Sequence, residues 1–117
     1  MTDAEKKALN EKIAVWYGFR KYIVNRYEQW FDKANHAVEI NFTDSPEQMV
    51  MLIDELVKRK YNAYIFTCGD RNEYFVQIVK FGGSRVIAIG RAETMPLAVA
   101  MAVGKLIEKE QADGKRD

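Results

Sequence analysis

Three positively charged residues near the ends of predicted strands have the chemistry that a phosphate site needs. Lys80 and Arg85 flank a Gly-Gly pair, and Arg91 lies six residues further along the chain. Arginine suits phosphate because its planar guanidinium makes paired, charge-assisted hydrogen bonds. With Tyr74 available for stacking, these residues predict a binding site for a nucleotide or another small phosphorylated ligand. The alternative is that the charges solvate the strand ends and discourage edge pairing.

The sequence lacks the combinations of residues that catalysis would need. His36 is the single histidine and has no Cys/His cluster at ligand spacing, so we predict no metal site. Cys68 is the single cysteine and has no evident base beside it. Asp54 and Glu55 are adjacent on a predicted helix, where they face different directions. We therefore predict no catalytic residue, no cofactor and no enzymatic activity.

A run of large aromatic residues near the start of the chain is the second candidate site. The apolar spacing predicts one helix from residue 3 to about residue 28, although Gly18 interrupts its stripe. One helix face cannot bury all of these aromatic residues, and tyrosine and tryptophan are enriched at interfaces. We therefore predict a homo-oligomer, most simply a dimer; the alternative is that the stripe covers one face of the sheet. The predicted interface residues are Trp16, Tyr17, Tyr22, Tyr27 and Trp30.

Three strands and two further helices must position these residues. Residues 61–68, 73–81 and 85–90 read as strands joined by short turns, which makes neighbouring strands antiparallel. A helix to about residue 59 begins after Ser45, whose side chain is a capping group, with Pro46 at its first position. An apolar helix runs from about residue 94 to residue 110. Residues 37–42 are compatible with a short fourth strand or an extended segment.

The middle strand is apolar on both faces, which predicts that something covers each face of the sheet. The fold class is therefore α+β. A three-stranded antiparallel sheet is expected between helices, in the core order α-β-β-β-α with an extra N-terminal helix.

The composition is that of one intracellular domain. The chain has 117 residues, 48% hydrophobic and 30% charged, with a net charge of +1. We expect one domain over residues 1–111, a disordered polar tail over residues 112–117, and a cytoplasmic location. We predict no membrane segment, because no apolar run approaches the roughly 20 residues that span a bilayer.

Two families share features with this sequence. The core order is also that of double-stranded RNA-binding domains, but residues 94–100, at the start of the last helix, carry no positive charge to meet phosphates, so we do not expect nucleic-acid binding. The chain resembles the phage ABA-sandwich domain family more closely. The resemblance rests on residues 11–16, residues 41–45 and residues 90–98, which read EKIAVW, NFTDS and GRAETMPLA.

The ABA-sandwich resemblance covers about three-quarters of the chain and implies helix, sheet and helix layers, with no common activity or catalytic residues to carry over. A phage or prophage origin implies an accessory role during infection or lysogeny. Our first functional hypothesis is therefore a non-enzymatic phage protein that binds a partner protein, including a host protein, and counters host defence. The alternative hypothesis is a nucleotide-binding protein that sequesters a small phosphorylated signal.

Overall fold

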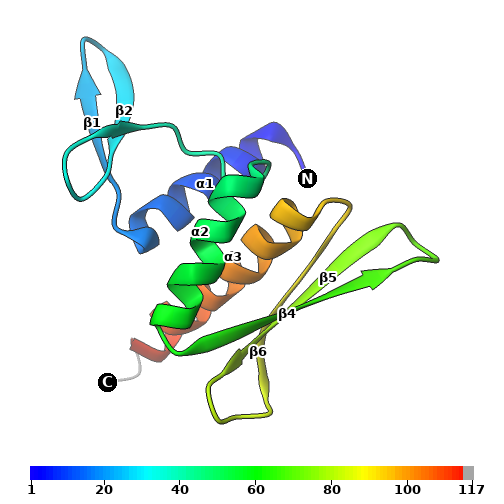
Figure 1. Cartoon of the computed structure of the whole chain (residues 1–117). Helices are drawn as coiled ribbons and strands as arrows, with labels where there is room; N and C mark the ends of the chain where they lie inside the picture. The colour runs from blue at the N-terminus through cyan, green and yellow to red at the C-terminus, as the bar shows by residue number, and fades with distance from the viewer. Residues whose placement is uncertain (115–117) are drawn as a thin grey trace.

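The computed structural model describes residues 1–114 and is an α+β fold with two separate antiparallel sheets (Figure 1). Each sheet has three strands, in the orders β1-β2-β3 and β4-β5-β6. The elements are α1 (Asp3–Tyr17), β1 (Arg20–Val24), β2 (Tyr27–Phe31), β3 (Ala37–Val38), α2 (Pro46–Lys58), β4 (Tyr61–Cys68), β5 (Glu73–Lys80), β6 (Val86–Ala92) and α3 (Met95–Gly114).

The prediction that the first helix continues to about residue 28 is wrong. Helix α1 ends at Tyr17, because Gly18 terminates it. Gly18 has a φ of +109°, which is open to glycine and strained for other residues. The amides of Gly18 and Phe19 donate to the carbonyls of Val15 and Ala14, which gives the last turn a Schellman-type end. The interval expected to continue the helix instead forms a β-hairpin.

This hairpin, residues 20–31, is called the arm here, since it projects from the body (Figure 1). Val24 pairs with Tyr27 across a two-residue turn in which Asn25 and Arg26 both have positive φ, as type I′ turns require. The radius of gyration is 14.8 Å, whereas a compact chain of this length has about 13.4 Å. The arm therefore lies outside the globular body.

The predicted start of α2 and the three predicted main strands are confirmed. The side chain of Ser45 accepts a hydrogen bond from the amide of Gln48, and Pro46 opens α2. The three strands β4, β5 and β6 match the expected ranges within two residues.

The short fourth strand exists at Ala37–Val38, but it pairs with β2 of the arm rather than with the main sheet. Helix α3 runs to Gly114, so residues 112–114 of the expected tail are helical, and residues 115–117 lie outside the described residues.

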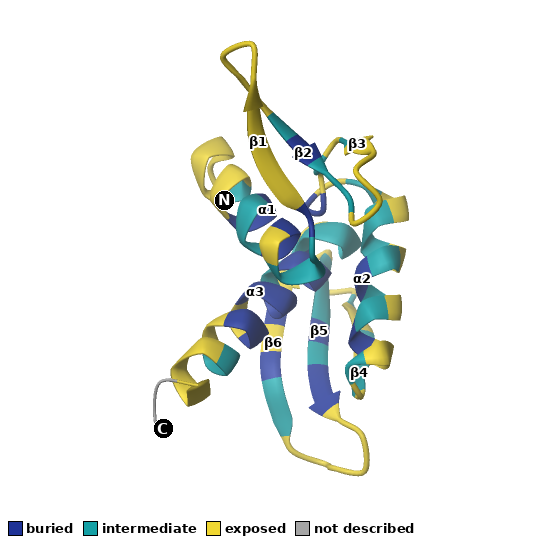
Figure 2. Ribbon diagram, turned by 90° about the vertical axis from the view of Figure 1, so that its left-hand side faces the viewer, coloured by how far each residue is buried: buried dark blue, intermediate teal, exposed yellow. Residues whose placement is uncertain are grey.

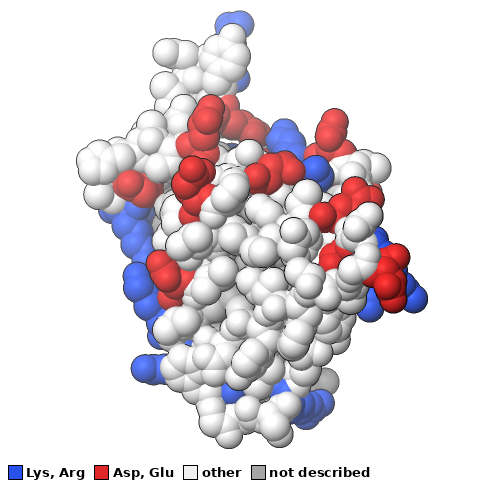
Figure 3. All heavy atoms as spheres, turned by 45° about the vertical axis from the view of Figure 1, so that its right-hand side comes forward, with Lys and Arg blue, Asp and Glu red and all other residues white. Residues whose placement is uncertain are grey.

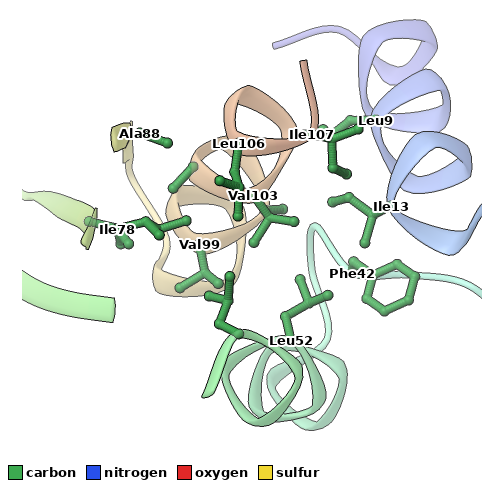
Figure 4. Packing of buried hydrophobic residues seen from close by; sticks show 14 of the residues in the cluster. Leu9, Ile13, Phe42, Leu52, Ile78, Ala88, Val99, Val103, Leu106 and Ile107 are labelled. Carbon is green, nitrogen blue, oxygen red and sulfur yellow. The ribbon is translucent and has the colours of Figure 1, made fainter. Parts of the chain in front are cut away.

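Helices cover only one face of the β4–β6 sheet, which differs from the expected sandwich. Helix α3 contacts β5 and β6, α2 contacts β4, and α1 packs on α3. Figure 2 shows α1, α2 and α3 on the side of the sheet that faces the viewer. The core lies among these helices and the covered face, where Val103 and Ile107 of α3 lie next to Ile13 and Leu9 of α1 (Figure 4).

The contact between α3 and β6 is unusually close. A Cβ atom at Gly90 would overlap the carbonyl oxygen of Ala98 and would lie 2.6 Å from the amide nitrogen of Ala102. Both neighbours are helix backbone, which cannot rotate away as a side chain can. Glycine on the strand and alanines on the helix therefore let the two backbones touch.

Gly90→Ala is expected to lower the free energy of unfolding by about 3 kcal/mol, because α3 must move away from β6 to admit a methyl group. Urea denaturation followed by circular dichroism measures this loss. Gly69→Ala is the matched control, since no atom lies within 4 Å of its Cβ position. Equal stability of the two variants would contradict the close packing of α3 on β6.

Candidate functional site

The four predicted ligand-binding residues lie in two groups at opposite ends of β6. Lys80 and Arg85 line a cleft of about 410 Å³ between the end of the β5–β6 hairpin and the last turns of α3. Arg91 is six residues from Arg85, about 20 Å along an extended strand. The structure thus brings together Lys80 and Arg85 and separates them from Arg91 and Tyr74.

The cleft contains a third cation that the sequence reasoning missed. Lys109 of α3 lines it together with Tyr61, and Ile87 and Leu106 supply apolar walls. Among the described residues, no carboxylate lies within 4 Å of the charged groups of Lys80, Arg85 or Lys109. Glu110 and Asp113 also line the cleft. The only sequence signal for Lys109 was its position near the end of a predicted helix, which does not say that this end meets the hairpin.

Arg91 and Tyr74 have structural partners at the other end of the sheet. Arg91 lies 3.6 Å from Glu73 and stacks over Phe75, 5.3 Å from the ring centroid. It also lines a shallow hollow with Arg71 and Cys68. Tyr74 packs against the hydrophobic core on the helix-covered side of the sheet. Their positions favour roles in the fold rather than in one site with Lys80.

Trp16 is half-buried and makes several contacts within the molecule. Its indole Nε1 donates to Glu110 Oε2 at 3.3 Å, and the guanidinium of Arg59 stacks over its ring at 3.9 Å. The same Arg59 donates to the carbonyl of Trp16 at 2.6 Å and pairs with Glu55 at 3.0 Å. This cluster joins the C-terminal ends of α1 and α2 to α3, because a cation complements the carbonyls at a helix end.

Tyr61 belongs to the same cluster, since its hydroxyl donates to Glu110 Oε1 at 3.2 Å. Burial raises the pKa of the Tyr61 phenol above its ordinary value, and the carboxylate of Glu110 raises it further. The neutral phenol is therefore the form that lines the cleft at physiological pH.

The five predicted interface residues fall into two groups, one in the body of the fold and one on the arm. Tyr17 packs between Phe19 and Phe42, with ring centroids 5.0 Å and 6.1 Å apart, and Trp30 is buried. With Trp16, these two residues belong to the body of the fold. Tyr22 and Tyr27 lie on the arm, where both are exposed.

The arm has an inward and an outward face. Lys21 and Trp30 are paired across the two strands and face α1, where Lys21 Nζ lies 3.9 Å from Glu11. The residues on the opposite side form what we call the outward face of the arm. It consists of Tyr22, Val24, Tyr27 and Phe31, with Gln29 between them and Arg20 opposite Phe31 at the root. Tyr27 is 77% exposed, and Tyr22 and Val24 are nearly half exposed.

The uncovered side of the β4–β6 sheet is a second apolar surface, which we call the open face. Cross-strand partners share a face, and the registers Tyr64–Gln77–Ile89 and Phe66–Phe75–Arg91 place these residues opposite the helices. Tyr64, Phe66 and Ile89 are 49%, 48% and 38% exposed. Figure 3, in which the side that carries β4 and β5 comes forward, shows a broad surface without charged side chains. The apolar character of both faces was visible in the sequence, but the identity of the uncovered face was not.

His36 and Cys68 lie in different parts of the fold. His36 is in the exposed loop between β2 and β3, with Nδ1 3.5 Å from Asp32. Hydrogen bonds from the amides of His36 and Ala34 lower the pKa of the Asp32 carboxyl. Cys68 is a half-buried free thiol at the end of β4. Within residues 1–114, no three His, Cys, Asp or Glu side chains are grouped closely enough to hold a metal ion.

No family model, curated protein or solved structure matches this chain significantly. No helix in the described part of the chain is long and apolar enough to cross a membrane. The arm, the open face and the cleft are therefore the features that indicate a function.

Proposed function

We propose that this chain is a non-catalytic protein-binding module and that the outward face of the arm contacts the partner. The observation that carries the proposal is the exposure of Tyr22, Val24 and Tyr27 on a hairpin that stands away from the core. Exposed apolar groups on a projecting element are costly unless a partner covers them. Tyrosines provide large and rigid contact area, which is why interfaces favour them.

The arm is anchored well enough to present this surface in one orientation. Trp30 is buried at its root, and Lys21 lies within 4 Å of both Glu11 and Glu28. The ring of Tyr22 packs edge-on against Phe31 at 5.6 Å. A preorganised contact surface loses less conformational entropy on binding than a flexible loop does.

The resemblance to phage ABA-sandwich proteins extends this proposal. It suggests that the chain acts in the cytoplasm of an infected host cell and that the partner is a host protein, with interference in host defence as one outcome. A homodimer is part of the same proposal.

Val24→Glu is expected to abolish partner binding, because it places a charge at the tip of the outward face, directly opposite Tyr27. A photoreactive benzoyl-phenylalanine at Tyr27, which pairs with Val24, should give a discrete adduct with another protein in host cells. The adduct should disappear with Val24→Glu and persist with Val15→Glu, a matched change at an exposed valine of α1. Absence of an adduct, or an adduct indifferent to Val24→Glu, would refute the role of the arm.

A second candidate function, the binding of a small phosphorylated ligand, is favoured by the cleft at Lys80. Three cations that lack an acidic partner within 4 Å among the described residues line a cleft of about 410 Å³ with apolar walls. A ligand with an anionic group and an aromatic body would match this lining. Tyr61, and not Tyr74, is the aromatic residue that lines this cleft and is available for stacking.

Nucleotides and cyclic dinucleotides should raise the melting temperature by several degrees if the cleft binds them, since a ligand that binds only the folded state stabilises it. Arg85→Glu should remove the rise, whereas Arg71→Glu, in the β4–β5 turn, should keep it. No rise at millimolar ligand, or a rise that survives Arg85→Glu, would exclude this site for these ligands.

A further inference from the structure

The open face carries apolar side chains at positions where a solvent-facing sheet carries polar ones. Outward positions of an antiparallel sheet with one covered face are normally polar. Here the central strand places Phe75, Gln77 and Val79 on the open face, and Phe81 follows the strand. The opposite positions, Val76 and Ile78, are fully buried under the helices. The open face thus has the composition of a second core face.

We infer that the open face binds the same face of a second copy of this chain, forming a symmetric dimer with two stacked sheets. This inference deepens the proposed protein-binding function by naming one partner and one surface. It does not use the arm, which lies on a different part of the molecule (Figure 1).

The size of the open face supports a dimer. Tyr64, Phe66, Phe81 and Ile89 are each between 38% and 49% exposed. At 150–250 Å² for a whole aromatic side chain, these four expose roughly 350 Å² together. These four side chains alone thus supply more than half of the roughly 600 Å² per copy at which the range for specific stable interfaces begins.

The charges on the open face fit a second copy better than a charged partner. The middle row, Tyr64–Gln77–Ile89, is neutral, so the centre of a self-contact brings no like charges together. Arg91 is paired with Glu73 at one end of the face. At the other end, Lys60 lies 6.0 Å from the Phe81 ring centroid and has no acidic partner within 4 Å in the described part of the chain.

This charge distribution selects one of the two simple symmetric arrangements. A two-fold axis parallel to the strands would place each end of the face against the same end of the partner. An axis across the strands instead brings Lys60 of each copy to the end where Glu73 of the other copy lies, and places the two Gln77 side chains near the axis. The second arrangement places Lys60 of each copy beside the Glu73–Arg91 pair of the other copy, whereas the first brings the two Lys60 ends together. Stacked sheets pack about 10 Å apart, a separation that the interdigitating aromatic side chains would fill.

Sedimentation equilibrium of the whole chain tests the inference, with twice the monomer mass of 13.5 kDa expected at tens of micromolar. Phe66→Glu should weaken the dimer at least tenfold, while Val24→Glu on the arm should leave it unchanged. A monomer at all concentrations would overturn the inference, as would a dimer that Val24→Glu dissociates and Phe66→Glu does not.

A second measurement keeps the inference testable if Phe66→Glu is poorly folded. In a Cys68→Ser background, Gln77→Cys should be joined to its copy by a short bismaleimide at dimer-forming concentrations. Val15→Cys, at an exposed position of α1, should not be cross-linked to its copy. Equal cross-linking at both positions would overturn the assignment of the open face.

Lys60→Glu tests the proposed axis. It should weaken the dimer at low salt, because it places two carboxylates at each end of the interface. Unchanged or tighter association would overturn the arrangement with the axis across the strands. Because Phe66→Glu, Gln77→Cys and Lys60→Glu all lie outside the arm, failure of the dimer would leave the arm proposal to its own cross-linking test.

Discussion

The close approach of α3 to β6 determines the arrangement of the other helices. Gly90 on the strand and Ala98 and Ala102 on the helix allow the two backbones to touch, so α3 lies directly on the sheet. The opposite side of α3 uses the same device, because a Cβ atom at Gly104 would lie 2.6 Å from the Leu9 side chain of α1. Helix α3 is therefore the middle layer between the sheet and α1. With α2 beside it over β4, all three helices gather on one side of the sheet.

The candidate binding surfaces follow from that arrangement. A chain that places its three helices on one face of the sheet has none left to cover the other, although the strands are apolar on both faces. The arm stands apart for a related reason: Trp16 and Tyr17, which precede it, are tied to Glu110 and Phe42 inside the body. The hairpin that follows Gly18 then projects from a fixed base and shows its outward face to the surroundings.

The sequence predicted the elements better than their layers. Ser45 and Pro46 marked the start of α2, and the turns around residues 69–72 and 82–83 marked the three main strands, because these signals act within a few residues. The sequence predicts a helix to about residue 28 because the apolar residues of this interval fit a period of three to four as well as a period of two. Gly18 was the signal that separates the two interpretations. Two apolar sheet faces suggested a sandwich, since a sequence does not say whether a cover comes from the same chain. The contact of Trp16 with Glu110 joins residues 94 positions apart and had no local signal at all.

Covalent footprinting with a small carbene reagent, read out by mass spectrometry, tests the central claim that a single copy leaves one face of its sheet uncovered. The protein should be labelled at a dilution at which its mass is that of a monomer. The account predicts labelling of Tyr64 and Phe66 at a level near that of Tyr27 on the arm, with Phe42 in the core protected. Protection of Tyr64 and Phe66 to the level of Phe42 under these conditions would show that the chain covers the face itself, and would contradict the account.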